Sequence, residues 1–103
     1  MPVLGTLNAN TTVEISFDAS PTNASPVGLR AGFVGGPVLG YQLVARGGAT
    51  KFRGTVPASA KVLEVAVDVP DGGGSGNLTV VGTPTQKVVQ VTQEGVYTLW
   101  VTG

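Results

Sequence analysis

Apolar and polar side chains alternate along most of this chain, which is the pattern of half-buried β-strands. The clearest stretch runs from Lys61 to Val69. Its apolar face comprises Leu63, Val65, Val67 and Val69, and its other face comprises Glu64, Ala66 and Asp68. Because side chains in a strand point alternately to opposite faces, this pattern predicts a strand with one side in a hydrophobic core.

Similar patterns, separated by Gly, Pro, Asn and Ser, predict eight or nine short strands and no helix. We expect strands near residues 11–18, 28–34, 41–46, 51–56, 61–69, 77–82, 87–92 and 96–102, with 3–7 as an edge strand or an arm. Turn signals every 8–12 residues are typical of an antiparallel β-sandwich or a small barrel. We favour the sandwich, because the strands are short and the turns irregular.

The composition fits this architecture and one domain. The chain has 103 residues, of which 42% are hydrophobic, and its 16 glycines and 7 prolines lie between the apolar runs. A domain of this size buries a core without needing disulfides or metal. No apolar run approaches the roughly 18 residues that a membrane helix requires. Residues 1–5 have neither a basic nor a continuous apolar region, so no signal peptide is expected.

Most side chains that perform catalysis are missing. Without His or Cys, the chain has no Ser-His-Asp triad, no Cys-His dyad and no ordinary zinc site. Glu64 and Asp68 share one strand face, four residues apart, which favours a solvated surface over a catalytic pair across a cleft. Asp68 and Asp71 with nearby carbonyls could bind calcium, but we favour ordinary turn acids. We therefore expect a protein that is not an enzyme and has no metal or cofactor.

Charge is sparse and unevenly ordered. Only 12% of residues are charged and the net charge is zero, which argues against a nucleic-acid partner. The stretch 19–63 carries five bases and no acid, whereas the remainder carries six acids and one base. Separate surface regions of net +5 and −5 would suit complementary docking. The alternative, which we favour, is that basic and acidic strands lie side by side and cancel.

In the last predicted strand, the single Trp lies on the opposite face from the residues that best fit a hydrophobic core. Tyr97, Leu99 and Val101 share one face, and Trp100 lies on the other. If that side faces solvent, Trp100 is an exposed aromatic of the kind that anchors interfaces. The alternatives are that Trp100 faces the core and Tyr97 faces out, or that the N-terminal lead covers Trp100.

The half of the chain from Phe52 to Gly103 resembles the β-sandwich modules of the pre-peptidase C-terminal type, which are attached to secreted bacterial peptidases. The resemblance is carried by Val62–Val69, by Asn77–Val81 and by the ending Glu94–Val101. It implies a secreted binding module. Such modules often have acidic residues around an Asp-Leu-Asp sequence, where this chain has Asn77-Leu78-Thr79, so the resemblance does not carry a calcium site here.

As a short, neutral, Cys-free β-sandwich, the chain is also similar in class to the decoration (cement) proteins of tailed phage capsids. This similarity implies a non-enzymatic virion protein that forms homo-oligomers or contacts shell subunits. We expect the interface to include Trp100, the lead Val3–Leu7 and a basic hairpin spanning Arg46–Arg53. The individual candidates are Val3, Leu4, Leu7, Arg46, Lys51, Arg53 and Trp100. The alternative is a secreted or cell-surface module that recognises polysaccharide or peptide.

Overall fold

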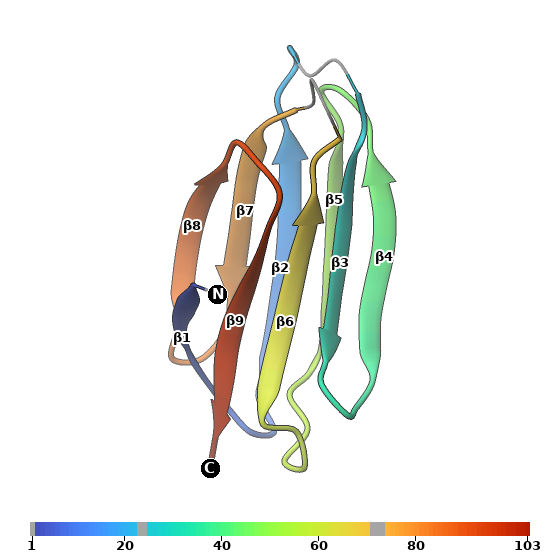
Figure 1. The fold of residues 1–103 in the computed structure, drawn as a ribbon. Helices are drawn as coiled ribbons and strands as arrows, with labels where there is room; N and C mark the ends of the chain where they lie inside the picture. Colours follow the sequence, from blue (N-terminus) through green and yellow to red (C-terminus); the bar gives the residue numbers. More distant parts are fainter. Residues whose placement is uncertain (1, 23–24, 71–73) are drawn as a thin grey trace.

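The structure is a computed structural model that describes residues 2–22, 25–70 and 74–103. These residues form nine strands and no helix, arranged as two sheets packed face to face (Figure 1). The sheets remain open and do not close into a barrel, so the predicted all-β sandwich is confirmed. No helix in the described part of the chain is long and apolar enough to cross a membrane.

The strands divide between a five-stranded and a four-stranded sheet. The five-stranded sheet has the order β1 (Val3–Asn8), β9 (Gly95–Thr102), β6 (Val62–Asp68), β3 (Val27–Phe33) and β4 (Val38–Val44). The four-stranded sheet has the order β5 (Ala49–Thr55), β2 (Thr12–Ala19), β7 (Gly76–Val81) and β8 (Gln86–Val91). Every strand pair is antiparallel except β1 with β9, which is parallel.

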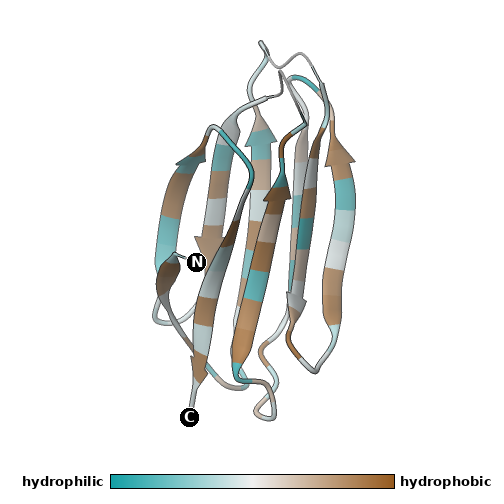
Figure 2. Cartoon of the chain, viewed as in Figure 1, coloured by the Kyte–Doolittle hydropathy of each residue, from teal (hydrophilic) through white to brown (hydrophobic). Residues whose placement is uncertain are grey.

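The hydrophobic core lies between the two sheets, as the alternation predicts (Figure 2). On β6, Leu63, Val65 and Val67 are fully buried. Leu63 is in register with Leu99 on one side and with Phe33 on the other, so core residues form rows across the sheet. From the four-stranded sheet, Phe17 and other fully buried side chains complete this core. The sum of many such contacts is what stabilises a sandwich of short strands.

The stretch Arg46–Arg53 is not a hairpin, which corrects the sequence-based expectation. β4 belongs to the five-stranded sheet and β5 to the four-stranded sheet, so the turn at Gly47 carries the chain from one layer to the other. The two strands meet at the corner of the sandwich through side chains. Leu39 of β4 packs over Gly54, and Phe52 of β5 packs over Gly40.

Candidate interaction surface

The outer face of the five-stranded sheet is unusually apolar. The described residues contain eight large hydrophobic side chains that are exposed, and six of them belong to this face. These six are Val3, Val34, Val38, Tyr41, Leu43 and Trp100. Leu43 and Trp100 are next to the buried Val44 and Leu99, so they point to the opposite side of the sheet. Tyr41 is in register with the exposed Arg30 on that same side, and Val34 follows the buried Phe33 in the turn after β3. Such a concentration on one face is typical of an interaction surface.

Trp100 lies at one end of this face, on β9, and its side chain is 50% exposed. It is in register with Val62 of β6, whose carbonyl accepts a hydrogen bond of 2.9 Å from the amide of Val34. Together with Val3, these side chains border an open hollow of about 280 Å³. Leu99 is buried and Tyr97 packs against the core, so the facing of β9 is the one that alternation predicts.

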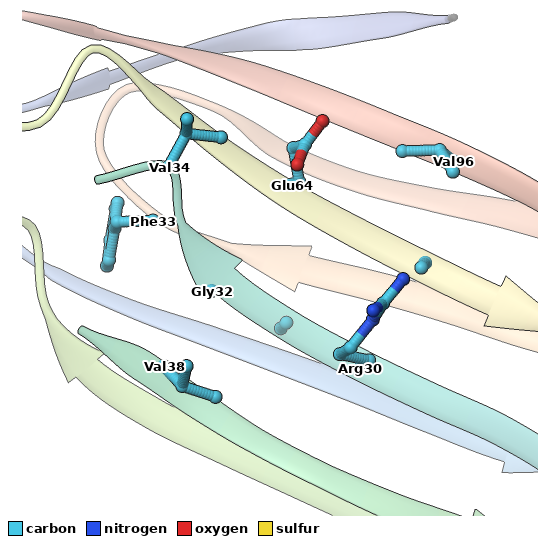
Figure 3. Close-up of a pocket in the computed structure, with 9 residues that line it drawn as sticks. Arg30, Gly32, Phe33, Val34, Val38, Glu64 and Val96 are labelled. Carbon is cyan, nitrogen blue, oxygen red and sulfur yellow. The ribbon is translucent and has the colours of Figure 1, made fainter. Parts of the chain in front are cut away.

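A second hollow, of about 370 Å³, lies at the centre of the face (Figure 3). Val34, Val38 and Val96 border it, and Arg30 and Glu64 project from the neighbouring strands β3 and β6. In the described part of the chain neither charged side chain makes an ion pair. Arg30 and Glu64 therefore lie inside a largely apolar surface, with Asp68 as a further acidic side chain on the outer face of β6, and a partner of complementary charge could pair with them.

The outer face of the four-stranded sheet is polar by comparison. On β2, Thr12, Glu14 and Asp18 point outward, and on β5 Lys51 and Arg53 do so. The Nζ atom of Lys51 lies 3.4 Å from Oε1 of Glu14, and Arg53 is in register with the same glutamate. The basic strand β5 therefore lies beside the acidic strand β2, which is the local cancellation favoured from the sequence.

The predicted interface residues are distributed over different parts of the molecule. Val3 is 53% exposed on the apolar face, but Leu4 and Leu7 are only 9% and 0% exposed and belong to the core. They are withdrawn from the candidate interface, because a side chain in the core cannot contact a partner. Arg46 is exposed in the β4–β5 connection. Lys51 and Arg53 lie on the polar face, away from Trp100.

The contribution of β4 to this face was not predicted from the sequence. Val38, Tyr41 and Leu43 are 73%, 60% and 59% exposed, and all three lie on the same face as Trp100. A signal for them exists in the sequence. The outward positions of the segment 38–44 are Val, Tyr and Leu, and the segment contains no charge, unlike the solvated strand β2.

The acidic residues that the structure describes do not gather into a metal-binding group. Glu64 and Asp68 lie on the outer face of β6, as expected, and Asp71 lies outside the described residues. No group of three or more acidic side chains that could hold a metal ion occurs among residues 2–22, 25–70 and 74–103. The most distinctive surface of the described molecule is therefore the apolar face of the five-stranded sheet.

Comparison of the chain with known protein families, with curated proteins and with solved structures found no match.

Proposed function

We propose that this protein is a non-enzymatic structural protein that docks onto a larger protein assembly through the outer face of its five-stranded sheet. The observation that carries the proposal is that, among the described residues, six of the eight exposed large hydrophobic side chains lie on that one face. Trp100 at one end and Tyr41 at the other are the aromatic anchors, since aromatic side chains dominate the energetics of protein interfaces.

The size of the face suits a stable interface. The molecule measures 41 × 22 × 22 Å, so one broad side covers roughly 900 Å² in projection. A standard protein–protein interface buries about 800 Å² on each partner. Docking would cover the two hollows and bring Arg30 and Glu64 against oppositely charged groups of the partner. The mechanism is stabilisation by added contact area, because a subunit that binds only the assembled state raises the free energy needed to open it.

The most concrete version of this proposal is a decoration subunit that contacts the shell proteins of a virion, as the similarity in class implies. In that version the apolar face lies against the shell and the polar face, with its Lys51–Glu14 pair, faces solvent. This arrangement is supported by the contrast between the two outer faces, because a subunit held on one side needs only one apolar surface.

The second candidate is a secreted module that recognises polysaccharide or peptide. Carbohydrate platforms usually combine several exposed aromatic side chains. Here Tyr41 and Trp100 are three strands apart and four residues apart along the strand direction, which corresponds to about 20 Å. Because the side chains between them are Val and Ala together with Arg30 and Glu64, the face offers no continuous stack of rings for a sugar chain. The geometry favours a protein partner.

The test compares Trp100→Ala with Val88→Ala. Val88 is 64% exposed on the four-stranded sheet and is the matched control. If genes for phage head proteins neighbour the coding sequence, empty capsid shells are assembled from those head proteins. Each variant is added to the shells, and its binding and the melting temperature of the shells are measured. We expect wild type and Val88→Ala to bind and raise the melting temperature, and Trp100→Ala to bind at least about tenfold more weakly. Equal binding by both variants would contradict docking through this face, and selective binding to glycans would favour the module.

A further inference from the structure

The sandwich has four edge strands, and they differ in how their free backbone groups are covered. β1 is covered by the segment that leads into β8. The amide of Asn8 donates to the carbonyl of Thr83 over 2.7 Å, and the amide of Thr6 donates to Oγ1 of Thr85 over 3.0 Å. The ammonium group of Lys87, on β8, lies 3.4 Å from the carbonyl oxygen of Leu4. This side of the sandwich is closed by hydrogen bonds between the two layers.

The edges β5 and β8 carry charges that oppose pairing with another strand. β5 contains Lys51 and Arg53, and β8 contains Lys87. Charged side chains, and Lys in particular, are a common means by which proteins prevent association of sheet edges. Two copies of β5 placed side by side would also bring like charges together.

β4 has neither kind of protection. Its seven residues, Val38–Val44, include no charge and no proline. Within the described residues, its only backbone partner is β3, and no backbone hydrogen bond reaches its free edge. A hydrogen bond from β5 goes to a side chain of β4, where Oγ1 of Thr50 donates to Oε1 of Gln42 over 2.8 Å. Figure 1 shows β4 at the outer limit of the molecule, with no strand beyond it. An uncharged strand of high β-propensity with unpaired amides and carbonyls is a template for a further strand.

The side chains beside this edge also expose a large apolar surface to solvent. Val38, Tyr41 and Leu43 are among the most exposed large hydrophobic side chains of the described molecule, at 73%, 60% and 59%. They project from the outer face of β4, so a strand added at its edge would lie directly beside them. Strand addition would then bury apolar surface in addition to forming main-chain hydrogen bonds.

We propose that the occupant of this edge is β4 of a second copy of the chain, paired antiparallel about a two-fold axis. A strand can pair with itself in this way only if no like charges are brought opposite one another, and β4 meets that condition. With the axis near Gln42, the outward side chains of Tyr41 and Leu43 lie opposite one another across the pair. Arg46 of one copy then lies opposite Val38 of the other, so no like charges meet there. The two five-stranded sheets become one continuous sheet.

This inference rests on the proposed interaction function and identifies a second copy of the chain as the partner at the β4 edge of the five-stranded sheet. The dimer would present two apolar faces side by side, which doubles the surface available for docking on an assembly. Because the register of β4 against β3 shifts between Val38 and Gly40, the uninterrupted part of the strand is Gly40–Val44. It is about 17 Å long, which predicts a dimer of modest affinity rather than an obligate one.

The test combines native mass with amide hydrogen exchange on the full chain. We compare wild type with Leu43→Lys and with Val88→Lys, which adds the same charge at a similarly exposed position of the edge strand β8. We expect a dimer whose dissociation constant rises at least about tenfold in Leu43→Lys and is unchanged in Val88→Lys. As wild-type concentration increases, alternate amides of β4 should become protected from exchange.

Protection of alternate β4 amides distinguishes strand pairing from docking through the face, which leaves the edge open. A strict monomer up to about 1 mM would overturn the pairing, since even a weak biological dimer forms below that concentration. A dimer that Trp100→Ala weakens, with no protection in β4, would also overturn it but would leave the proposed docking function standing. The exchange result on wild type decides the question even if Leu43→Lys does not fold.

Discussion

Replacing Leu7 with Ala tests whether the N-terminal strand belongs to the core or to an interface. Leu7 is fully buried and lies against Gly82, at the side where β1 meets the four-stranded sheet. The substitution removes three carbon groups from the core, which corresponds to about 2.4 kcal/mol of lost transfer free energy. The cavity that remains adds to this cost, so we expect the free energy of unfolding to fall by about 3–4 kcal/mol.

The assay is equilibrium unfolding in urea, followed by circular dichroism. For a domain of this size with an m-value of about 1–3 kcal/mol/M, the midpoint should fall by about 1–4 M while the slope stays constant. Val3→Ala is the control on the same strand, because Val3 is 53% exposed and should cost less than about 1 kcal/mol. A loss below about 1 kcal/mol for Leu7→Ala, with weakened association instead, would refute the placement of Leu7 in the core.

Three further predictions concern the face, the corner and the charged side of the sandwich. About 100 Å² of exposed indole surface at Trp100 corresponds to about 2.5 kcal/mol, so Trp100→Ala should raise the dissociation constant of a docked complex by up to about 70-fold. Its circular dichroism spectrum should match wild type, and unfolding of the domain would place Trp100 in the core instead. Gly40→Ala puts a methyl group against the ring of Phe52, so we expect the free energy of unfolding in urea to fall by about 1–3 kcal/mol. Unchanged stability would contradict the close packing of β4 on β5. Lys51→Ala breaks an ion pair at the surface and should cost less than about 1 kcal/mol, with a smaller loss in 1 M salt. A larger, salt-independent loss would mean that Lys51 has a structural role beyond this pair.

The sequence was sufficient to predict the strands but not how they are connected in space. Alternation on β6 and β9 identified the core side of each strand correctly, because each strand has one face in the core. It did not predict that Ala66 and Thr98, on the opposite faces, are buried as well. Alternation says nothing about which strand lies next to which. The parallel pairing of β1 with β9 and the separation of β4 from β5 follow from long-range packing, which single-strand patterns do not encode.

In β1, a local irregularity of the backbone changes which side chains face the core. Leu4 and Leu7 are three residues apart, so a regular strand would place them on opposite faces. The register against β9 shifts between Val3 and Gly5, and Gly5 adopts a φ of +155° that suits glycine. This irregularity turns both leucines toward the core and leaves Val3 outside. Two of the predicted interface residues were therefore core residues, while Trp100 is exposed on the face where its strand pattern placed it.

The ends of β4 were also not predicted correctly from the sequence pattern. A strand was expected at 41–46 from the sequence, whereas β4 begins at Val38 and ends at Val44. The amide of Phe33 donates to the carbonyl of Pro37 over 2.9 Å, so the turn closes early and β4 starts directly after the proline. The earlier start adds Val38 to the apolar face, which is why that face was larger than the sequence suggested.

The fluorescence of Trp100 offers the most direct test of docking through the five-stranded sheet, because it is the only Trp in the chain and lies on the proposed surface. Acrylamide quenching and light scattering are measured together as the protein is concentrated or mixed with shells. In species larger than a dimer, docking through this face predicts a blue-shifted emission and reduced quenching. If such species form while Trp100 stays as accessible as in the monomer, the apolar face is not the docking surface.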